Sequence, residues 1–152
     1  MIDYRPDDLT TPAVRALVAS HLAGMHDTSP PESVHALDAT ALTDPSIRFW
    51  TAWDGAELAG MGALALRGAT RGEIKSMRVS PSHLGRGIGR GMLRHIVAES
   101  RTLGLASLWL ETGSTAEFVP AVRLYESEGF VVCGPFDDYV EDPFSIFMTR
   151  TL

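Results

Sequence analysis

The stretch that decides the fold is Val79 to Leu93, which reads VSPSHLGRGIGRGML. It joins a segment that alternates like a strand to a segment with helical spacing, and it is rich in glycine. Glycine lacks Cβ, so its backbone can approach an anion closely and can adopt positive φ. The free N–H groups and the positive dipole end at the start of a helix bind phosphate. The stretch therefore predicts a phosphate-binding loop that contains Gly85, Gly87, Gly89 and Gly91, with Arg86 and Arg90 beside them.

Three other kinds of loop share part of this pattern. A plain glycine-rich turn before an arginine-bearing helix has the same composition. The loop of nucleotide triphosphatases requires GxxxxGK[ST], and no lysine follows any of these glycines. A dinucleotide-binding fold requires GxGxxG, but here the third glycine position falls on Arg90 or Met92. Glu111, at the end of the next apolar run, does stand roughly where that fold places its ribose-binding acid, so a nucleotide-dependent oxidoreductase stays as a weaker alternative.

Composition sets the broad class of the protein. A chain of 152 residues, 45% of them hydrophobic, suits one globular domain over residues 1–152. The formal net charge of −6 and the pI of about 5.3 disfavour a nucleic-acid partner. The start MIDYRPDD has neither a basic nor an apolar region, and no apolar run reaches roughly 18 residues, so we expect a cytoplasmic protein with no membrane partner. The single cysteine, Cys133, excludes an internal disulfide and fits a reducing compartment.

Apolar periodicity predicts helices and strands that alternate along the chain. Thr11 is the expected N-cap of a helix that begins at Pro12 and ends before Ser29. Asp54-Gly55, between two apolar runs, is a strong hairpin signal. The predicted helices are 12–28, about 32–42, about 88–104 and about 116–126, and the predicted strands are 47–53, 57–66, 73–79, 105–110, 130–133 and 144–149.

Two motifs in this chain resemble those of the GCN5-related N-acetyltransferase (GNAT) family. The run V-x-P-x-x-x-G-x-G-I-G-x-x-[ML]-L, Val79 to Leu93, is similar to that family's acetyl-CoA loop, and A-x-x-L-Y-x-x-x-G-F, Ala121 to Phe130, is similar to its last helix. The element order also agrees from Ile2 to Leu152, and parts of the sequence look like a bacterial branch of unknown acceptor. The resemblance implies an α/β (α+β) fold with a mixed, twisted, mostly antiparallel central sheet flanked by helices. Two parallel strands, ending at Val79 and Glu111, would splay apart into a wedge.

The resemblance implies an acetyl-CoA-dependent N-acetyltransferase that transfers acetyl to a primary amine of a small molecule or peptide, by direct attack in a ternary complex. The pantetheine arm would bond to strand backbone, and the pyrophosphate would rest on the N–H groups of the loop. Two positions depart from the family: Leu84 stands where Gln or Arg is usual, and Phe118 where Asn is usual. The implied cofactor-binding residues are Met77, Arg78, Val79, Leu84, Gly85, Arg86, Gly87, Ile88, Gly89, Arg90 and Gly91.

The resemblance also implies three catalytic groups. The N–H of Met77 would polarise the thioester carbonyl. Tyr125, whose phenol has an ordinary pKa of about 10, would protonate the leaving thiolate. Glu73, fourteen residues before Gly87, would accept the proton of the amine, which requires that burial raise its pKa or that water relay the proton. Without the motifs, Tyr125 is a core residue and Glu73 a solvent-facing residue paired with Lys75 or Arg71.

The remaining signals are weaker. The five histidines show no metal-binding spacing, so we expect no metal, and each has an expected core or surface role, although His83 adjoins the loop and could face phosphate. The acidic tract 137–142 suits a cationic amine but equally suits a surface loop. A homodimer is left open. The alternative function is a non-catalytic acyl-CoA-binding sensor or interaction protein, against which Glu73 and Tyr125 argue because a sensor needs neither.

Overall fold

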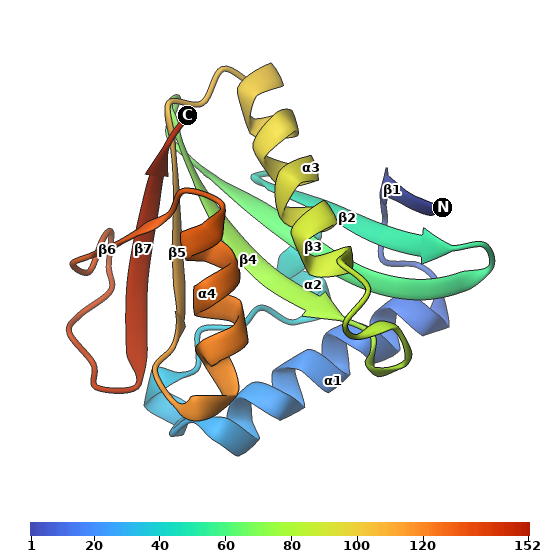
Figure 1. The fold of residues 1–152 in the computed structure, drawn as a ribbon, viewed down its shortest axis with the longest axis horizontal. Helices are drawn as coiled ribbons and strands as arrows, with labels where there is room; N and C mark the ends of the chain where they lie inside the picture. Colours follow the sequence, from blue (N-terminus) through green and yellow to red (C-terminus); the bar gives the residue numbers. More distant parts are fainter.

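A computed structural model, which describes residues 1–152, contains one seven-stranded sheet with helices on both faces (Figure 1). The strand order is β1-β2-β3-β4-β5-β7-β6, and every neighbouring pair is antiparallel except β4 and β5. The predicted mixed, mostly antiparallel sheet is therefore confirmed. The strands are β1 (Ile2–Pro6), β2 (Ile47–Asp54), β3 (Glu57–Arg67), β4 (Arg71–Val79), β5 (Ser107–Gly113), β6 (Val131–Cys133) and β7 (Ser145–Thr151).

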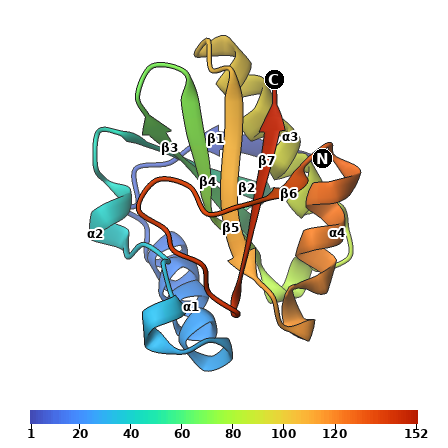
Figure 2. The ribbon, with the colours of Figure 1, turned by 90° about the vertical axis from the view of Figure 1, so that its left-hand side faces the viewer.

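Helices α1 and α2 cover one face of the sheet, and α3 and α4 cover the other (Figure 2). Each layer has its own apolar cluster, with Leu17 and Phe49 in the first and Leu93 and Leu108 in the second. Burial on both faces explains why β3 is apolar without alternation. The helices are α1 (Pro12–Thr28), α2 (Ala39–Leu42), α3 (Ile88–Thr102) and α4 (Val119–Ser127), and none combines the length and apolarity needed to cross a membrane.

The parallel strands β4 and β5 pair only along their first halves. The pairing runs from Arg71 opposite Ser107 to Ile74 opposite Leu110. Beyond this point β4 stays with β3 as far as Val79, while β5 stays with β7 as far as Gly113. The two strands therefore diverge, and the predicted splay is confirmed.

A bulge interrupts β4 on the side of this splay. Ser76 and Met77 together face the single residue Gly62 of β3, because the register shifts between Met61 and Ala63. Ser76 has a φ of 56°, which a residue with a side chain rarely adopts. A Cβ on Gly62 would lie 2.9 Å from the sulfur of Met77, so glycine is required there. The bulge leaves the backbone of Met77 without a ladder partner on β3.

Three elements differ from the sequence-based prediction. Strand β1 was not expected, because its five residues are mostly polar, and it forms by pairing along β2. The helix predicted over about 32–42 is instead a short 3-10 turn and the four-residue α2, which Asp38 caps. Strand β5 continues past Leu110 to Gly113, so Glu111 lies inside the strand.

Candidate active site

The glycine loop forms a cradle of backbone N–H groups at the start of α3. Gly85 and Gly87 have φ of 74° and 77°, which favours glycine at both positions. Gly87 is the N-cap of α3 and has no side chain to bond the first N–H groups of the helix. Those donors, with the positive end of the helix dipole, form a site for an anion of phosphate size.

A cleft of about 600 Å³ extends from this loop between β4 and α4. Ala121 and Leu124 of α4 face the loop and β4 across it. The cleft combines an anion site at one end with apolar walls, which suits a long ligand that carries phosphate at one end and a thin arm at the other. Of the predicted cofactor residues, it is lined by Met77, Arg78, Val79, Leu84, Gly85, Gly87, Ile88, Gly89 and Arg90.

Two predicted cofactor residues lie outside the cleft. Arg86 Nη1 donates to Asp54 Oδ2 at 3.1 Å, so its charge is directed to the β2–β3 hairpin. A Cβ on Gly91 would overlap the ring of Tyr4, whose hydroxyl donates to the Ile88 carbonyl at 3.2 Å. Gly91 is thus required by the packing of β1 against α3. Gly91 therefore serves the packing of α3, and Arg86 anchors the loop to the hairpin; neither lines the cleft.

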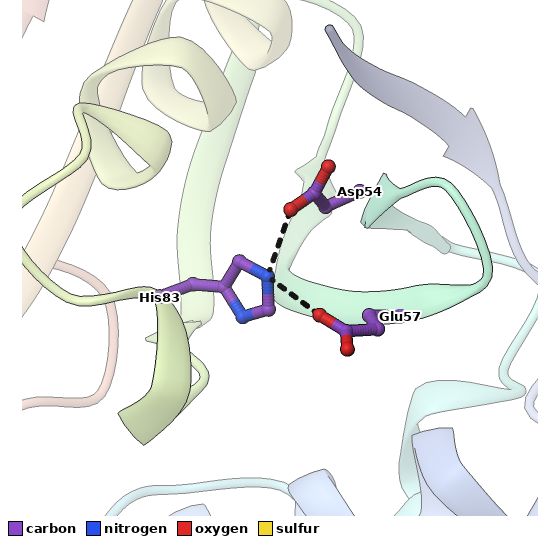
Figure 3. A group of neighbouring side chains, drawn as sticks. All are labelled: Asp54, Glu57 and His83. Carbon is purple, nitrogen blue, oxygen red and sulfur yellow. Dashed lines mark hydrogen bonds and ion pairs between the residues drawn. The ribbon is translucent and has the colours of Figure 1, made fainter.

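Figure 3 shows His83 turned toward Asp54 and Glu57 of the hairpin. Its Nε2 lies 3.2 Å from Asp54 Oδ2 and 3.4 Å from Glu57 Oε2, and its Nδ1 lies 2.8 Å from Ser82 Oγ. His83 is 2% exposed, which is the expected core role, and it does not line the cleft. The three ligand atoms lie within 4.8 Å of one another, but Asp54 Oδ2 already accepts from Arg86. The hydrogen bond of His83 with Asp54 and the ion pair of Arg86 with Asp54 hold this cluster together and tie the hairpin to the glycine loop.

A smaller chamber of about 120 Å³ continues beyond the cleft. The chamber and the cleft share Met77, Ala121 and Tyr125, so the two hollows meet at these side chains. An outer hollow of about 580 Å³ shares His35 and Glu73 with the chamber. The three hollows therefore adjoin in series, from the glycine loop past the splay of the strands to the surface beside Tyr139.

Tyr125 lies at the meeting point of cleft and chamber. Its side chain comes from α4, is 7% exposed and packs edge-on against Phe130 with ring centroids 5.7 Å apart. Burial raises the pKa of Tyr125 to about 12, so its hydroxyl keeps the proton at neutral pH. The sequence offered Tyr125 either as a core residue or as a residue of the site. In the structure Tyr125 is both, because it packs in the core and also lines the cleft and the chamber.

Glu73 is buried between two strands and a loop. Its Oε1 accepts from Arg67 Nη2 at 2.9 Å, and its Oε2 accepts from Lys75 Nζ at 3.2 Å and from the Tyr139 hydroxyl at 2.6 Å. Burial would raise the pKa of Glu73, but Lys75, Tyr139 and Arg67 together outweigh burial and hold the pKa below its ordinary value. The raised pKa that direct proton acceptance requires is therefore absent. A role for Glu73 through water is the alternative to the assignment of this proton to another carboxylate of the chamber.

Glu111 is the second carboxylate of the chamber. It comes from β5, one residue past the end of the pairing with β4, and is half-buried. None of the ion pairs in the structure involves Glu111. Burial raises its pKa to about 7, the charges of Glu73 and Asp142 act in the same direction, and Ser145 and Lys75 act against them.

Sequence reasoning missed several residues of the chamber. Glu111, which the sequence suggests only as a ribose-binding acid, and Phe118, which departs from the family pattern, both line the chamber. Phe118 packs on Gly113, where a Cβ would overlap its ring. One signal was available for Glu111: it is a charged residue directly after the apolar run 105–110 of a buried strand. No local pattern marks Ser76, whose position follows from the bulge.

The chain matches known proteins over most of its length. The sequence model of the acetyltransferase (GNAT) family matches residues 14–130. The uncharacterized N-acetyltransferase YsnE of Bacillus subtilis (strain 168) is 54% identical over 146 residues, which are 96% of this chain and 97% of that protein. The uncharacterized N-acetyltransferase YedL of Escherichia coli (strain K12) is 49% identical over 152 residues, which are 100% of this chain and 96% of that protein.

A solved structure has the same fold. It is a GNAT family acetyltransferase from Elizabethkingia anophelis with acetyl-CoA bound. The TM-score is 0.73, and the match covers 99% of this chain and 98% of that chain at 21% identity. At this identity the likeness concerns the fold alone.

Proposed function

Because the chain belongs to the GCN5-related N-acetyltransferase (GNAT) family and is an acyltransferase, we propose that it transfers acetyl from acetyl-CoA to a primary amine of a small molecule or peptide. The amine attacks the thioester directly while both substrates are bound. The observation that supports this most is the meeting of cleft and chamber at Met77 and Tyr125, which gives each substrate its own approach. We also propose that residues 1–152 act as one catalytic domain, because one continuous sheet and the helices packed on it enclose the whole site.

The residues of the cleft fit two parts of acetyl-CoA, the pyrophosphate and the pantetheine arm. Free N–H groups at the start of α3 suit the pyrophosphate, while the Arg90 side chain, which also lines the cleft, is paired with Glu128. Beyond Ile74, β4 has no strand partner on the side of β5, so the backbone at Met77 and Val79 is available to the amide groups of the pantetheine arm. Leu84, which is 66% exposed, adds apolar contact at the loop in place of the usual polar side chain.

Two groups at the junction suit the chemistry of acetyl transfer. The N–H of Met77, at the bulge, is the proposed donor to the thioester oxygen as negative charge develops there. The protonated hydroxyl of Tyr125 is the proposed acid for the leaving sulfur. Cys133 lies on the edge strand β6 and lines none of the three hollows, so it offers no route through an acetylated cysteine.

Anchoring of the loop by the hairpin should tune the affinity for acetyl-CoA. We expect Asp54→Asn to raise the Kd roughly fivefold, about 1 kcal/mol, because it weakens the hold on Arg86 and His83 without touching the cleft. Isothermal titration calorimetry measures this change. Glu57→Gln is the matched control, since Glu57 is 74% exposed at its side chain and does not pair with Arg86. An equal Kd for wild type and Asp54→Asn would contradict the anchoring role.

A screen of primary amines for acetyl-CoA-dependent thiol release tests the proposed function. The expected result is release of CoA thiol with at least one amine, together with an acetylated product of the matching mass. Tight binding of acetyl-CoA with no thiol release for any amine would indicate the sensor instead. Retention on immobilised CoA, compared with immobilised NAD, separates both from an oxidoreductase.

A further inference from the structure

We propose that the chamber binds the nitrogen of a primary alkylamine and that Glu111 is the catalytic residue that takes the proton from this nitrogen. The inference rests on the proposed acetyl transfer and assigns the acceptor side of the same site. A primary alkylammonium group with a pKa near 10.4 is deprotonated to only about one part in 2,500 at pH 7. An ammonium nitrogen has no lone pair for attack, so a group beside it must accept a proton.

The position of Glu111 fits that task. Pairing of β4 with β5 ends at Leu110, so Glu111 is the first β5 residue inside the splay. It lines the chamber together with Met77 and Tyr125, the two residues through which the chamber meets the cleft. A nitrogen held in the chamber therefore lies between Glu111 and the proposed position of the thioester.

The two carboxylates of the chamber differ in their partners. Both oxygens of Glu73 are held by Arg67, Lys75 and Tyr139, and protonating Glu73 would leave two cations without their counter-charge. Glu111 forms no ion pair and stands at the strand divergence. Its proton affinity near neutral pH follows from burial. Glu73 thus holds the wall of the chamber, and Glu111 is free to exchange a proton.

Two polar atoms in the same chamber have no partner in the protein. They are Ser76 Oγ and His21 Nδ1, and Ser76 is 7% exposed. A buried polar atom without a hydrogen bond is costly, so both positions favour a polar ligand or water in the chamber. Burial and then the charge of Arg78 lower the pKa of His21 to about 4, so His21 is neutral and does not repel an ammonium group.

The charged and titratable groups around Glu111 come from every wall. Strand β4 contributes Glu73 and Lys75, α1 contributes His21, and α4 contributes Tyr125. The segment before α2 contributes His35, whose pKa burial and then Lys75 lower. The segment before β7 contributes Asp142, whose charge raises the pKa of Glu111, and Tyr139, whose pKa is raised by the charge of Glu111. Of the cations whose charges reach these groups, Lys75 and Arg67 are paired with Glu73, and Arg78, which acts on His21, lines the cleft and not the chamber.

The step balances in protons and bonds. Glu111 takes one proton from R–NH₃⁺ and becomes a neutral carboxylic acid that later returns this proton to solvent. The freed lone pair forms the C–N bond at the thioester carbonyl carbon, and the C–S bond breaks. Tyr125 gives its proton to the departing sulfur and regains one from the new amide nitrogen, directly or through water. The products are the acetylated amine, CoA thiol and one proton.

Glu111→Gln tests the proposal because it keeps the shape and cannot accept a proton. The probes are ethylamine and 2,2,2-trifluoroethylamine, whose ammonium form is far more acidic. We expect kcat/KM for ethylamine to fall about 10²-fold at pH 6 to 7 and to recover much of the loss near pH 9. For trifluoroethylamine at pH 7 the variant should stay close to wild type. Glu73→Gln is the matched comparison, and its pH profile should run parallel to wild type whatever its absolute rate.

A stability measurement checks Glu111 without any amine. Its pKa in the folded protein, about 7, lies above the ordinary value of 4.5. Folding therefore favours the protonated form, so the contribution of Glu111 to stability is complete below about pH 4.5 and is lost as pH rises through 7. Glu111→Gln cannot ionise, so its Tm should equal that of wild type near pH 4.5 and exceed it at pH 8.

The outcomes separate this proposal from the proposed function. If wild type binds acetyl-CoA but acetylates neither these two probes nor any amine of the screen, the proposed function is overturned and the role of Glu111 with it. If wild type acetylates ethylamine and Glu111→Gln has a parallel pH profile, only the role of Glu111 is overturned. Recovery at high pH by Glu73→Gln in place of Glu111→Gln would assign the proton to Glu73.

Discussion

Gly89→Glu should abolish acetyl-CoA binding while the protein stays folded. Gly89 lies in the first turn of α3, and a Cβ there would meet only ordinary contacts, at 3.5 Å from Val79 Cγ2 and 3.6 Å from Leu124 Cδ2. The fold therefore accepts a side chain at this position. The carboxylate would enter the cleft beside the proposed phosphate site, where like charges repel. Calorimetry should show a Kd raised by at least about 10²-fold, roughly 2.7 kcal/mol, with an unchanged circular dichroism spectrum.

Gly89→Gln is the matched control, since it adds the same bulk without the charge. We expect Gln to weaken binding less than Glu, and the difference between the two measures the repulsion between the carboxylate and the phosphates. Because salt screens charges, raising the ionic strength should narrow that difference. An undiminished affinity of Gly89→Glu for acetyl-CoA would show that the phosphates bind elsewhere.

The parts of the fold that the sequence predicted are those with local causes. The hairpin between β2 and β3 follows from Asp54-Gly55, where Gly55 has a φ of 60°. The glycine loop likewise follows from positions that require positive φ, at Gly85 and Gly87. Strand β1 was missed because its pattern is weak, and it is stabilised by its partner β2. The splay could be expected only through the family resemblance, because residue spacing does not indicate where two paired strands diverge.

The glycine loop of the candidate site was predictable from the sequence, whereas the partners of its charged side chains were less so. Lys75 lies two residues after Glu73 on the same strand, and the sequence already suggested it as an ion-pair partner of Glu73. Tyr139, which donates to the same carboxylate, is 66 residues from Glu73 in the sequence, and no residue pattern predicts that contact. Arg71, the other expected partner of Glu73, pairs with Asp137 instead. Pairings across the chamber depend on where loops return to the sheet, which one sequence does not specify.

Tyr125→Phe should lower kcat about 10²-fold and leave the KM for acetyl-CoA nearly unchanged. The substitution removes only the hydroxyl, which is the proposed proton donor to the leaving sulfur at the junction of cleft and chamber. Because burial raises the pKa of Tyr125 to about 12, the hydroxyl stays protonated from pH 6 to pH 9. The loss should therefore be the same across that range. Steady-state kinetics at several pH values measures it.

This flat profile distinguishes the two proposed proton-transfer residues from each other. A defect at Glu111 should shrink as the amine loses its proton to solution, whereas a defect at Tyr125 should not, since the thiolate still needs a proton at pH 9. Packing gives no competing explanation, because the Phe ring keeps the edge-on contact with Phe130 and the Tm should hardly change. An unchanged kcat with an amine that the wild type acetylates would mean that the thiolate leaves without help from Tyr125, which would then be a core residue at the junction.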